Sequence, residues 1–457
     1  MKFGPIIPEE GKLHTAWYAF FFLNFFIMGI GRYFNIPIPL SAAVEIGYFL
    51  CIVGIMSCAK FDGNAKRVSC AMFVIYLPWL IYSIIEVGNV SAEIPYSVIA
   101  SRWLAEVRTM AIQVIYGMLI CAAIFTNKEQ VKTMYKVWGI CIIICTIKTL
   151  FQQYVGFDDA EKEFLIYAAK THYVNGIIRY FSLFSDAANY GCHMAAATAL
   201  FGAVTLSCKS LKEKIFFGIV TACALYGMMA SGTRTGIFVL GVGGVIYVIL
   251  SKRITTIITS VVVGGAFFFL LVFTNIGQGN NMIRRMRSAF DKNDASMSVR
   301  EMNQMAMKRY IDELPLGLGA GIRGEDVPQS NKNHFLSVVP PDSTWVYVNI
   351  HYGHLGRFIF LLSFLGMCFY AGWIVFFRIK DPELRGLLAG MVSGSTAMVV
   401  AGYANQIMLQ FPNCFVFFGQ LIIVYLGPDI ERRMQEKQKE ADKKLLLEQQ
   451  EEAKIVS

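Results

Sequence analysis

Apolar residues recur along this chain in long runs that are separated by short polar segments. A run of about 20 residues is long enough to cross the hydrocarbon core of a bilayer as an α-helix. The pattern predicts an all-α polytopic membrane protein with about twelve transmembrane helices, at residues 15–30, 41–59, 68–87, 104–125, 134–155, 185–207, 214–230, 235–250, 254–274, 355–377, 384–404 and 411–427.

Basic residues in the links between these helices alternate from one side to the other. One predicted side holds both termini and the links rich in lysine and arginine, at residues 60–67, 128–136, 209–214, 252–253 and 378–385. The other side holds residues 31–40, 88–103, 156–184, 231–236, 275–345 and 405–410. Basic links are retained on the cytoplasmic side. Both termini are therefore predicted to be cytoplasmic, in the cytoplasmic (inner) membrane of a bacterium.

The predicted spans divide the chain into four parts. They are the first nine helices (1–274), a large external loop (275–345), the last three helices (346–427) and a charged cytoplasmic C-terminal helix (428–457). Inside the external loop, residues 282–313 have apolar positions at helical spacing and predict helical segments that break near Asn293.

The amino-acid composition agrees with a membrane protein and argues against several classes of function. The chain is 55% hydrophobic and 16% charged, which excludes a soluble globular protein. The net charge of +9 is largely that of the cytoplasmic links, so nucleic-acid binding is not predicted. The run 15–30 lacks a small-residue cleavage site and is interpreted as a retained span. The 11 cysteines lie in or beside apolar runs and behave as small hydrophobic residues.

One arginine stands between two predicted spans, in the turn Ser231-Gly-Thr-Arg234-Thr-Gly236. A charge at the membrane boundary is costly unless it snorkels to the headgroups or meets an anion. A simple interhelical turn with a snorkelling arginine would explain Arg234 alone. Two further arginines, Arg179 and Arg300, fall on the same predicted side, which favours a site for an anion.

Two other kinds of site receive little support from the sequence. Residues 319–324 match a GxGxxG pattern, but they lack the flanking strand and helix of a dinucleotide site. On the external side, no group of histidine, cysteine and carboxylate residues has the spacing of metal ligands. No metal and no other cofactor is predicted.

Several short motifs follow one another in a fixed order: Arg179-Tyr-Phe-Ser-Leu-Phe-Ser-Asp186-Ala-Ala-Asn189, Ser231-Gly-Thr-Arg234, Ser298-x-Arg300, Pro315-Leu-Gly-Leu-Gly-x-Gly321, Asp342-Ser343 and Gly353-x-x-Gly356. In order and topology they resemble the O-antigen polymerase and O-antigen ligase superfamily, over roughly residues 100–425. Ligases of this superfamily typically carry histidine and asparagine where this chain has Asp342 and Ser343. That departure favours a polymerase over a ligase.

The resemblance implies a glycosyltransferase of GT-C-like architecture that works without a metal at the outer face of the membrane. Its substrate would be an oligosaccharide linked to undecaprenyl diphosphate, and its partners would be the lipid bilayer and the flippase and chain-length regulator of the same pathway. Arginine holds phosphate with two parallel hydrogen bonds. Arg179, Arg234 and Arg300 are therefore predicted to bind the diphosphate leaving group.

The acceptor hydroxyl could be helped by a general base, for which Asp342, His351 and His354 are the candidates. The two histidines would share a face if their segment were helical, one turn apart. Each histidine taken singly is better explained by an interfacial ring bonded to backbone. For the whole chain, the alternatives to a polymerase are the related ligase, a secondary transporter and a structural membrane component.

Overall fold

The computed structural model describes residues 10–456 apart from 35–39, 59–62, 175 and 291–294, and it is helical almost throughout. The α-helices are α1 (Glu10–Phe25), α2 (Ile27–Tyr33), α3 (Leu40–Cys58), α4 (Gly63–Ile85), α5 (Tyr96–Ile124), α6 (Lys128–Tyr154), α7 (Asp159–His172), α8 (Ala187–Ser207), α9 (Leu211–Ala230), α10 (Thr235–Ser251), α11 (Ile254–Phe273), α12 (Asn281–Arg287), α13 (Ala295–Glu313), α14 (His334–Val338), α15 (Thr344–Trp373), α16 (Pro382–Ala401) and α17 (Asn413–Val456).

Short elements connect these helices. Four of them are single turns of 3-10 or π-helix: η1 (Glu86–Gly88), η2 (Ser288–Phe290), η3 (Gly324–Asp326) and η4 (Ile374–Arg378). The strands β1 (Tyr173–Val174) and β2 (Ile177–Ile178) form an antiparallel hairpin, with Tyr173 opposite Ile178. Arg179 follows this hairpin directly, so the hairpin sets the direction from which that side chain approaches.

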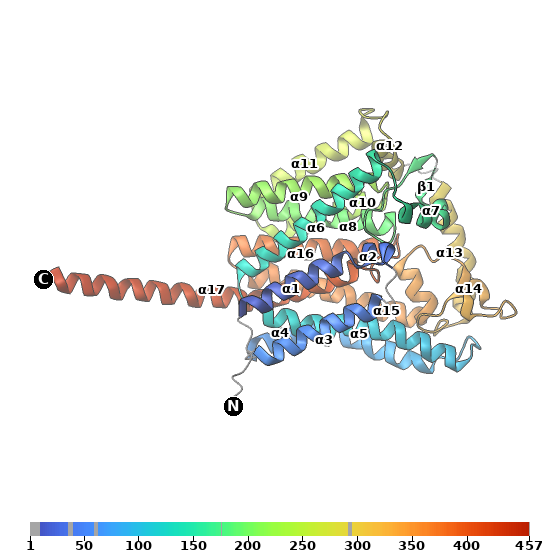
Figure 1. Cartoon of the computed structure of the whole chain (residues 1–457), viewed down its shortest axis with the longest axis horizontal. Coiled ribbons are helices and arrows are strands. Elements are labelled where there is room, and N and C mark those ends of the chain that lie inside the picture. Colours follow the sequence, from blue (N-terminus) through green and yellow to red (C-terminus); the bar gives the residue numbers. More distant parts are fainter. Residues whose placement is uncertain (1–9, 35–39, 59–62, 175, 291–294, 457) are drawn as a thin grey trace.

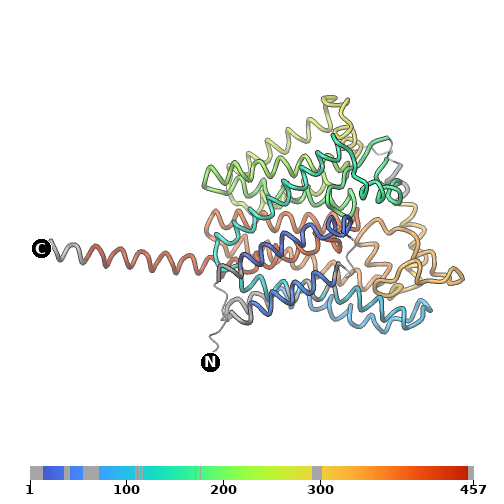
Figure 2. Tube along the Cα trace, viewed as in Figure 1, coloured from blue at the N-terminus to red at the C-terminus, as the bar shows by residue number. Residues whose placement is uncertain are grey.

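The long helices lie side by side, and the loops gather at two opposite ends of the bundle. At one end α1 begins and the last part of α17 projects away from the bundle (Figure 1). We call this the terminal end. At the other end lie β1, α7, α12, α13 and α14, which we call the loop end (Figure 1). The trace in Figure 2 shows the insert between α11 and α15 crossing the loop end.

Hydrogen bonds and ion pairs place the links in the same two groups that the sequence predicts. At the loop end, bonds join predicted external links in pairs: Tyr33 with Asp158, Asn89 with Gly317, Arg102 with Asp326, and Arg179 with Ser231. Ser185, the first residue of a predicted span, bonds there to Gln410 of another external link. At the terminal end, ion pairs join Lys128 with Glu383 and Lys132 with Glu213. Residues 60–62 of the predicted basic link at 60–67 lie outside the described residues, and no side chain in this link is described.

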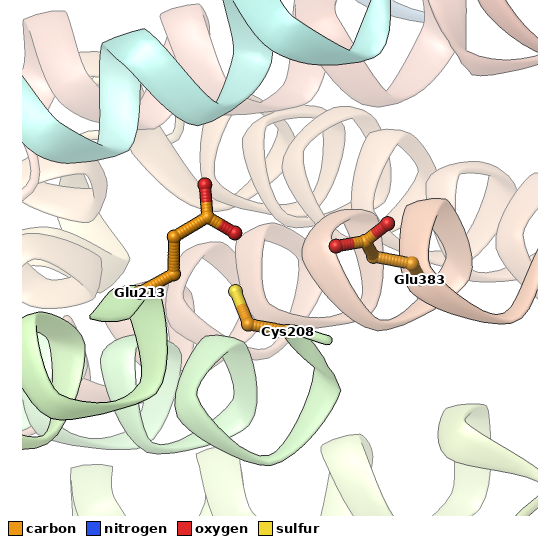
Figure 3. Close-up of side chains that lie close together, drawn as sticks. All are labelled: Cys208, Glu213 and Glu383. Carbon is orange, nitrogen blue, oxygen red and sulfur yellow. The ribbon is translucent and has the colours of Figure 1, made fainter. Parts of the chain in front are cut away.

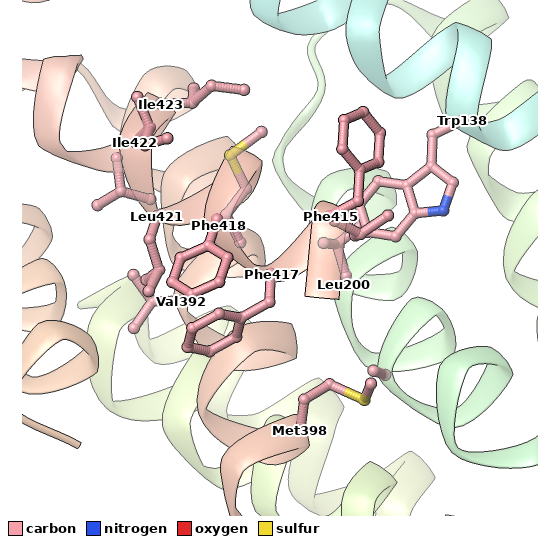
Figure 4. Packing of buried hydrophobic residues seen from close by; sticks show 14 of the residues in the cluster. Trp138, Leu200, Val392, Met398, Phe415, Phe417, Phe418, Leu421, Ile422 and Ile423 are labelled. Carbon is pink, nitrogen blue, oxygen red and sulfur yellow. The ribbon is translucent and has the colours of Figure 1, made fainter. Parts of the chain in front are cut away.

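The centre of the bundle is α8, which packs against α9, α10 and α16. Its alanines at 195, 197 and 203 are buried, and small side chains let neighbouring helices approach closely. Leu200 of α8 belongs to one large apolar core together with Trp138, Val392 and Phe415 from the surrounding helices (Figure 4). Because α8 touches protein on most of its surface, it tolerates polar residues such as Asn189 and His193.

The prediction of an all-α polytopic membrane protein is confirmed. A helix occupies each of the twelve predicted spans. Among the described residues, seven helices are long and apolar enough to cross a membrane, or eight if the bent pair α1 and α2 is one span. Four helices in predicted spans are not among these: α10 is a shorter apolar helix, α5 and α8 carry polar residues, and of α3 only Ala42–Gly54 is described in full.

Two predicted boundaries differ from the structure. Helix α15 begins at Thr344 and not at residue 355, because the Ser343 side chain caps it by accepting hydrogen bonds from the amides of Trp345 and Val346. Helix α17 continues through Pro428 to Val456, so the division at 427/428 is not a helix boundary. The predicted break near Asn293 lies outside the described residues, with α12 and α13 on either side of it.

Candidate functional site

The turn between α9 and α10 is buried and held by its own side chains. Ser231 and Thr233 are 0% and 3% exposed. The Ser231 hydroxyl donates to the Met228 carbonyl at 2.7 Å and accepts from the Thr233 amide at 3.1 Å. The Thr233 hydroxyl donates to the Ala187 carbonyl at 2.7 Å. This turn, residues 231–236, is therefore fixed against the start of α8, which is unlike an exposed interhelical connection.

Arg179 lies across this turn and bonds to it on two sides. Its Nε donates to the Ser231 carbonyl at 3.2 Å, and one terminal nitrogen donates to the Thr233 hydroxyl at 3.0 Å. The other terminal nitrogen donates to the Thr171 carbonyl at 2.8 Å. The structure therefore brings Arg179 to the turn that carries Arg234, as the sequence predicts.

A third arginine, Arg285 of α12, completes the cluster. It is only 8% exposed, and its Nε donates to the Gly232 carbonyl at 3.4 Å. Arg234 is half-buried, and it donates to the carbonyl of Ser288, which directly follows α12, at 3.5 Å. Arg179, Arg234 and Arg285 thus come from three separate segments. We call them the arginine cluster.

The arginine cluster concentrates positive charge at one point of the loop end. A β-carbon at Gly232 would lie 3.3 Å from Cγ of Arg179 and 3.4 Å from Cγ of Arg285, so both stems flank this glycine. Helix α10 begins at Thr235, and its N-terminus adds the positive end of a helix dipole. Guanidinium groups and a helix N-terminus together suit an anion such as phosphate.

Gly232→Ala tests how tightly this turn is built. Gly232 has a φ of +60°, and the left-handed conformation costs a residue with a β-carbon about 1–2 kcal/mol. We expect lower thermal stability in detergent and a larger loss of activity, because the new methyl group displaces both arginine stems. Gly241→Ala is the matched control, since a β-carbon there has nothing within 4 Å. Equal behaviour of the two variants would contradict the tight packing.

Diphosphate binding by Arg179, Arg234 and Arg300 stays a prediction, and the structure does not place the side chain of Arg300. This residue lies in α13. The helical pattern of residues 282–313 includes Arg285 but does not predict its place beside Arg179. Four arginines lie in residues 284–300, and spacing alone does not indicate which of them turns inward.

Asp342 occupies a strained position immediately before α15. Its φ is +51°, an unusual value for a residue other than glycine and one that often marks functional sites. The carboxylate is half-buried, and none of the described residues forms a hydrogen bond or ion pair with it. The next residue, Ser343, donates its hydroxyl hydrogen to the Gly402 carbonyl at 3.0 Å. This bond fixes the backbone directly after Asp342.

His351 and His354 do not share a face, because α15 has a kink between them at Gly353 (φ +67°, ψ −175°). The two ring nitrogens of His351 lie 2.9 Å from the Tyr347 carbonyl and 2.8 Å from the Ile322 carbonyl. A ring with both nitrogens facing carbonyl oxygens has no nitrogen directed at a substrate. Nε2 of His354 pairs with the Asp312 carboxylate at 3.0 Å in an exposed position.

Two glycine motifs of the sequence form one structural unit at this kink. The amides of Leu318 and Gly319 donate to the carbonyls of Ile350 and His351, at 2.8 Å and 3.0 Å. A β-carbon at Gly353 would lie 1.9 Å from the Pro315 carbonyl oxygen. The Pro315–Gly321 turn therefore needs glycine at the kink, and together they position the first turns of α15.

His172, which the sequence analysis did not consider, braces Arg179. Its Nε2 accepts a hydrogen bond from the Ala187 amide at 3.3 Å, while Nδ1 faces the Ala168 carbonyl at 3.0 Å. Burial lowers the pKa of this imidazole, which agrees with a neutral ring that accepts at Nε2. The His172 carbonyl accepts from the Arg179 amide at 2.9 Å, so the histidine links α7 to both α8 and the arginine.

Among the described residues, one group has the geometry for a metal ion, and it lies at the terminal end. Cys208, Glu213 and Glu383 point toward one another (Figure 3), with ligand atoms within 4.8 Å. Lys132 already bridges the two carboxylates, 3.1 Å from Glu213 and 2.8 Å from Glu383. Lys128 adds a second ammonium group, 2.8 Å from Glu383. The lysines supply the positive charge that a metal would bring, and the group is remote from the arginine cluster.

Part of the chain matches a known protein family. A family model described as O-antigen ligase matches residues 219–361. This segment begins inside α9 and ends inside α15, so it contains Arg234, Arg285 and Asp342 but not Arg179. The resemblance seen in the sequence is confirmed by this match. Among curated proteins, none matches the chain.

Proposed function

We propose that this chain, which falls in the O-antigen polymerase and ligase superfamily through residues 219–361, is a polysaccharide polymerase. Enzymes of this family are membrane proteins of the glycosyltransferase kind. In the proposed reaction, a glycan passes from undecaprenyl diphosphate to a sugar hydroxyl of another lipid-linked repeat unit. The product would be an O-antigen, capsule or exopolysaccharide chain.

The observation that carries this proposal is the arginine cluster. Three segments bring Arg179, Arg234 and Arg285 to one turn at the loop end, and that turn lies inside the matched segment. The departing group of the proposed reaction is a diphosphate, whose charge grows as its bond to the sugar breaks. Fixed guanidinium groups stabilise such charge without a divalent ion.

The chemical step requires one bond to form and one to break. The acceptor oxygen attacks the anomeric carbon of the donor sugar, and the bond from that carbon to the diphosphate oxygen breaks, with its electron pair leaving on the diphosphate. The acceptor proton passes to the Asp342 carboxylate and from there to water. Asp342 suits this role better than His351, whose ring nitrogens both face backbone carbonyls.

The alternative is the ligase reaction, which transfers the finished polymer to a lipid A-core or another acceptor. The description of the matching family model favours it, whereas Asp342 and Ser343 favour the polymerase. Lipid-linked glycans extracted from cells with and without the gene separate the two. Single repeat units should accumulate if the chain is a polymerase, and long polymer still attached to its lipid if it is a ligase. Unchanged glycans would refute both reactions.

The proposed reaction requires the loop end to face outward from the cytoplasmic membrane. A cysteine introduced at Ser330, in the insert across the loop end, should react in intact cells with a reagent that does not cross membranes. The matched control is a cysteine at Lys439, in the projecting part of α17, which should react only after the cells are made permeable. The reverse result would overturn the orientation.

Activity should also persist in EDTA, since the arginine cluster takes the place of a divalent ion at the diphosphate. The measurement is turnover of a lipid-linked glycan by purified protein, with and without chelator. The control is a metal-dependent glycosyltransferase assayed in the same buffer. Complete loss of turnover that magnesium or manganese restores would contradict the proposed mechanism.

A further inference from the structure

The turn that follows α16 touches the start of α15. The Gly402 carbonyl accepts hydrogen bonds from the Thr344 amide at 2.8 Å and from the Ser343 hydroxyl at 3.0 Å. These bonds fix the residues directly after Asp342. The position of the Asp342 backbone is therefore set by α16 as well as by its own helix.

Asn405, three residues later in the same turn, joins this contact to the arginine cluster. Its Nδ2 donates to the Thr235 hydroxyl at 2.7 Å, and Thr235 follows Arg234 directly. Its carbonyl accepts from the Thr344 hydroxyl at 3.0 Å. Asn405 is 6% exposed, so neither bond competes freely with water. One residue thus bonds to the first residue of α10 and to the first residue of α15.

We infer that Asn405 is a positioning residue, which sets the distance between Arg234 and Asp342 in the reaction. The inference rests on the proposed function, in which Arg234 holds the donor diphosphate and Asp342 receives the acceptor proton. These two groups belong to different segments, and a transfer between two substrates needs both held in one geometry. A displacement of about 1 Å can lower such a rate by roughly 10²-fold.

The contacts of Asn405 explain why asparagine suits this position. Its short side chain donates to Thr235 and, at 3.7 Å, to the sulfur of Cys192, while its backbone accepts from Thr344. Alanine would keep the backbone bond but leave the Thr235 hydroxyl without its donor. Valine at position 235 would remove the same bond from the other side with little change in volume. The two substitutions should therefore have related effects.

The test uses the purified full-length protein and lipid-linked repeat units extracted from its own host. In Asn405→Ala, we expect kcat to fall by about 10- to 100-fold. The donor KM should change less than about twofold, because the three arginines of the cluster stay at the turn 231–236. Thr235→Val should give a similar loss, and Thr235→Ser, which keeps the hydroxyl, should restore most of it. In the double variant the losses should not add. The neighbouring Gln406→Ala is the control.

Each outcome bears on one part of the inference. Normal kcat in Asn405→Ala, or losses that add in the double variant, would overturn the positioning role. If Asn405→Ala does not fold, Thr235→Val decides alone, because unchanged kcat in that variant would also overturn the role. A rise in donor KM with constant kcat would assign Asn405 to donor binding and refute the inference. Wild-type protein that does not turn over these lipid-linked units would refute the proposed function itself.

Discussion

Replacing Arg234 by lysine should lower turnover by about 10²–10³-fold while the protein still folds, which is the usual loss when one fixed donor to a developing negative charge is removed. Lysine keeps the charge but loses the planar fork that holds two phosphate oxygens at once. Arg234 is the clearest test in the cluster. Its Nη1 donates to the Ser288 carbonyl at 3.5 Å, a long contact, and thermal stability measured beside turnover separates a folding defect from a loss of phosphate binding.

Arg285→Lys should show a similar loss, and here the chain offers a matched control. Arg284 lies one position earlier in α12, is exposed and bonds to Asn281. If the arginine cluster binds diphosphate, Arg285→Lys is severe and Arg284→Lys is mild. The measurement is turnover of a lipid-linked repeat unit by purified protein, together with thermal stability in detergent. If Arg234 only snorkels, lysine serves nearly as well. Near-normal turnover in Arg234→Lys and Arg285→Lys would refute the assignment of the arginine cluster as the diphosphate site.

Arg179→Lys is expected to be equally inactive but less informative. The Arg179 guanidinium bonds to Ser231, Thr233 and Thr171, so it also fastens the β1–β2 hairpin to the turn. Lysine cannot make these three bonds together. A loss of stability should therefore accompany the loss of turnover, in contrast to Arg234→Lys. That difference would distinguish Arg179, which holds the site together, from Arg234, which only binds the diphosphate.

The positions of the helices along the chain, and the grouping of their links, could be predicted from the sequence because the membrane imposes a strong pattern. Apolar runs give the spans and basic links give the sides, and both follow from the cost of placing polar groups in hydrocarbon. The bonds of Asn89, Arg179 and Gln410 across the loop end agree with the predicted grouping. What the pattern does not indicate is which helices are shielded by others. The central helix α8 is an example, since its polar residues are compatible with burial in protein.

The candidate site was predicted only in part, for reasons that particular residues illustrate. Arg179 and Arg234 were found because an arginine beside an apolar run is conspicuous. Arg285 was missed because three neighbouring arginines carry the same charge, and its burial depends on contacts between distant segments. His351 and His354 were placed on one face because helical spacing hides the break at Gly353, which depends on the packing of the Pro315–Gly321 turn.

Asn405 could not have been predicted at all. Its role depends on two hydrogen bonds to segments far away in sequence, and a single asparagine in a short external link carries no pattern. Such residues emerge only when the tertiary contacts are known. The arginine turn and the Asp342 segment, by contrast, each carry a local signal. Sequence motifs therefore indicate the candidate reacting groups, while the structure shows the contacts that hold their segments together.

Asp342→Asn should lower kcat by about 10²-fold, near the lower limit of the 10²–10⁴-fold that a general base usually contributes. Asparagine keeps the size of the side chain and removes its basicity. The loss should be smaller than that of the arginine variants, because a diphosphate departs readily once its charge is held and the acceptor then needs less help. The position itself tolerates the change, since asparagine also adopts a positive φ with little strain.

The control for Asp342→Asn is Asp312→Asn, which removes an exposed carboxylate that pairs with His354. Both variants are assayed for kcat and for donor KM. A base acts on the chemical step, so kcat should fall in Asp342→Asn with donor KM nearly constant, while Asp312→Asn should match the wild type. Should Asp342→Asn retain full kcat while Arg234→Lys is inactive, the acceptor needs no base, and charge stabilisation by the arginines would account for catalysis without Asp342. Loss of kcat in Asp312→Asn together with normal kcat in Asp342→Asn would instead point to His354 and Asp312, and would move the base from the start of α15 to the far side of its kink.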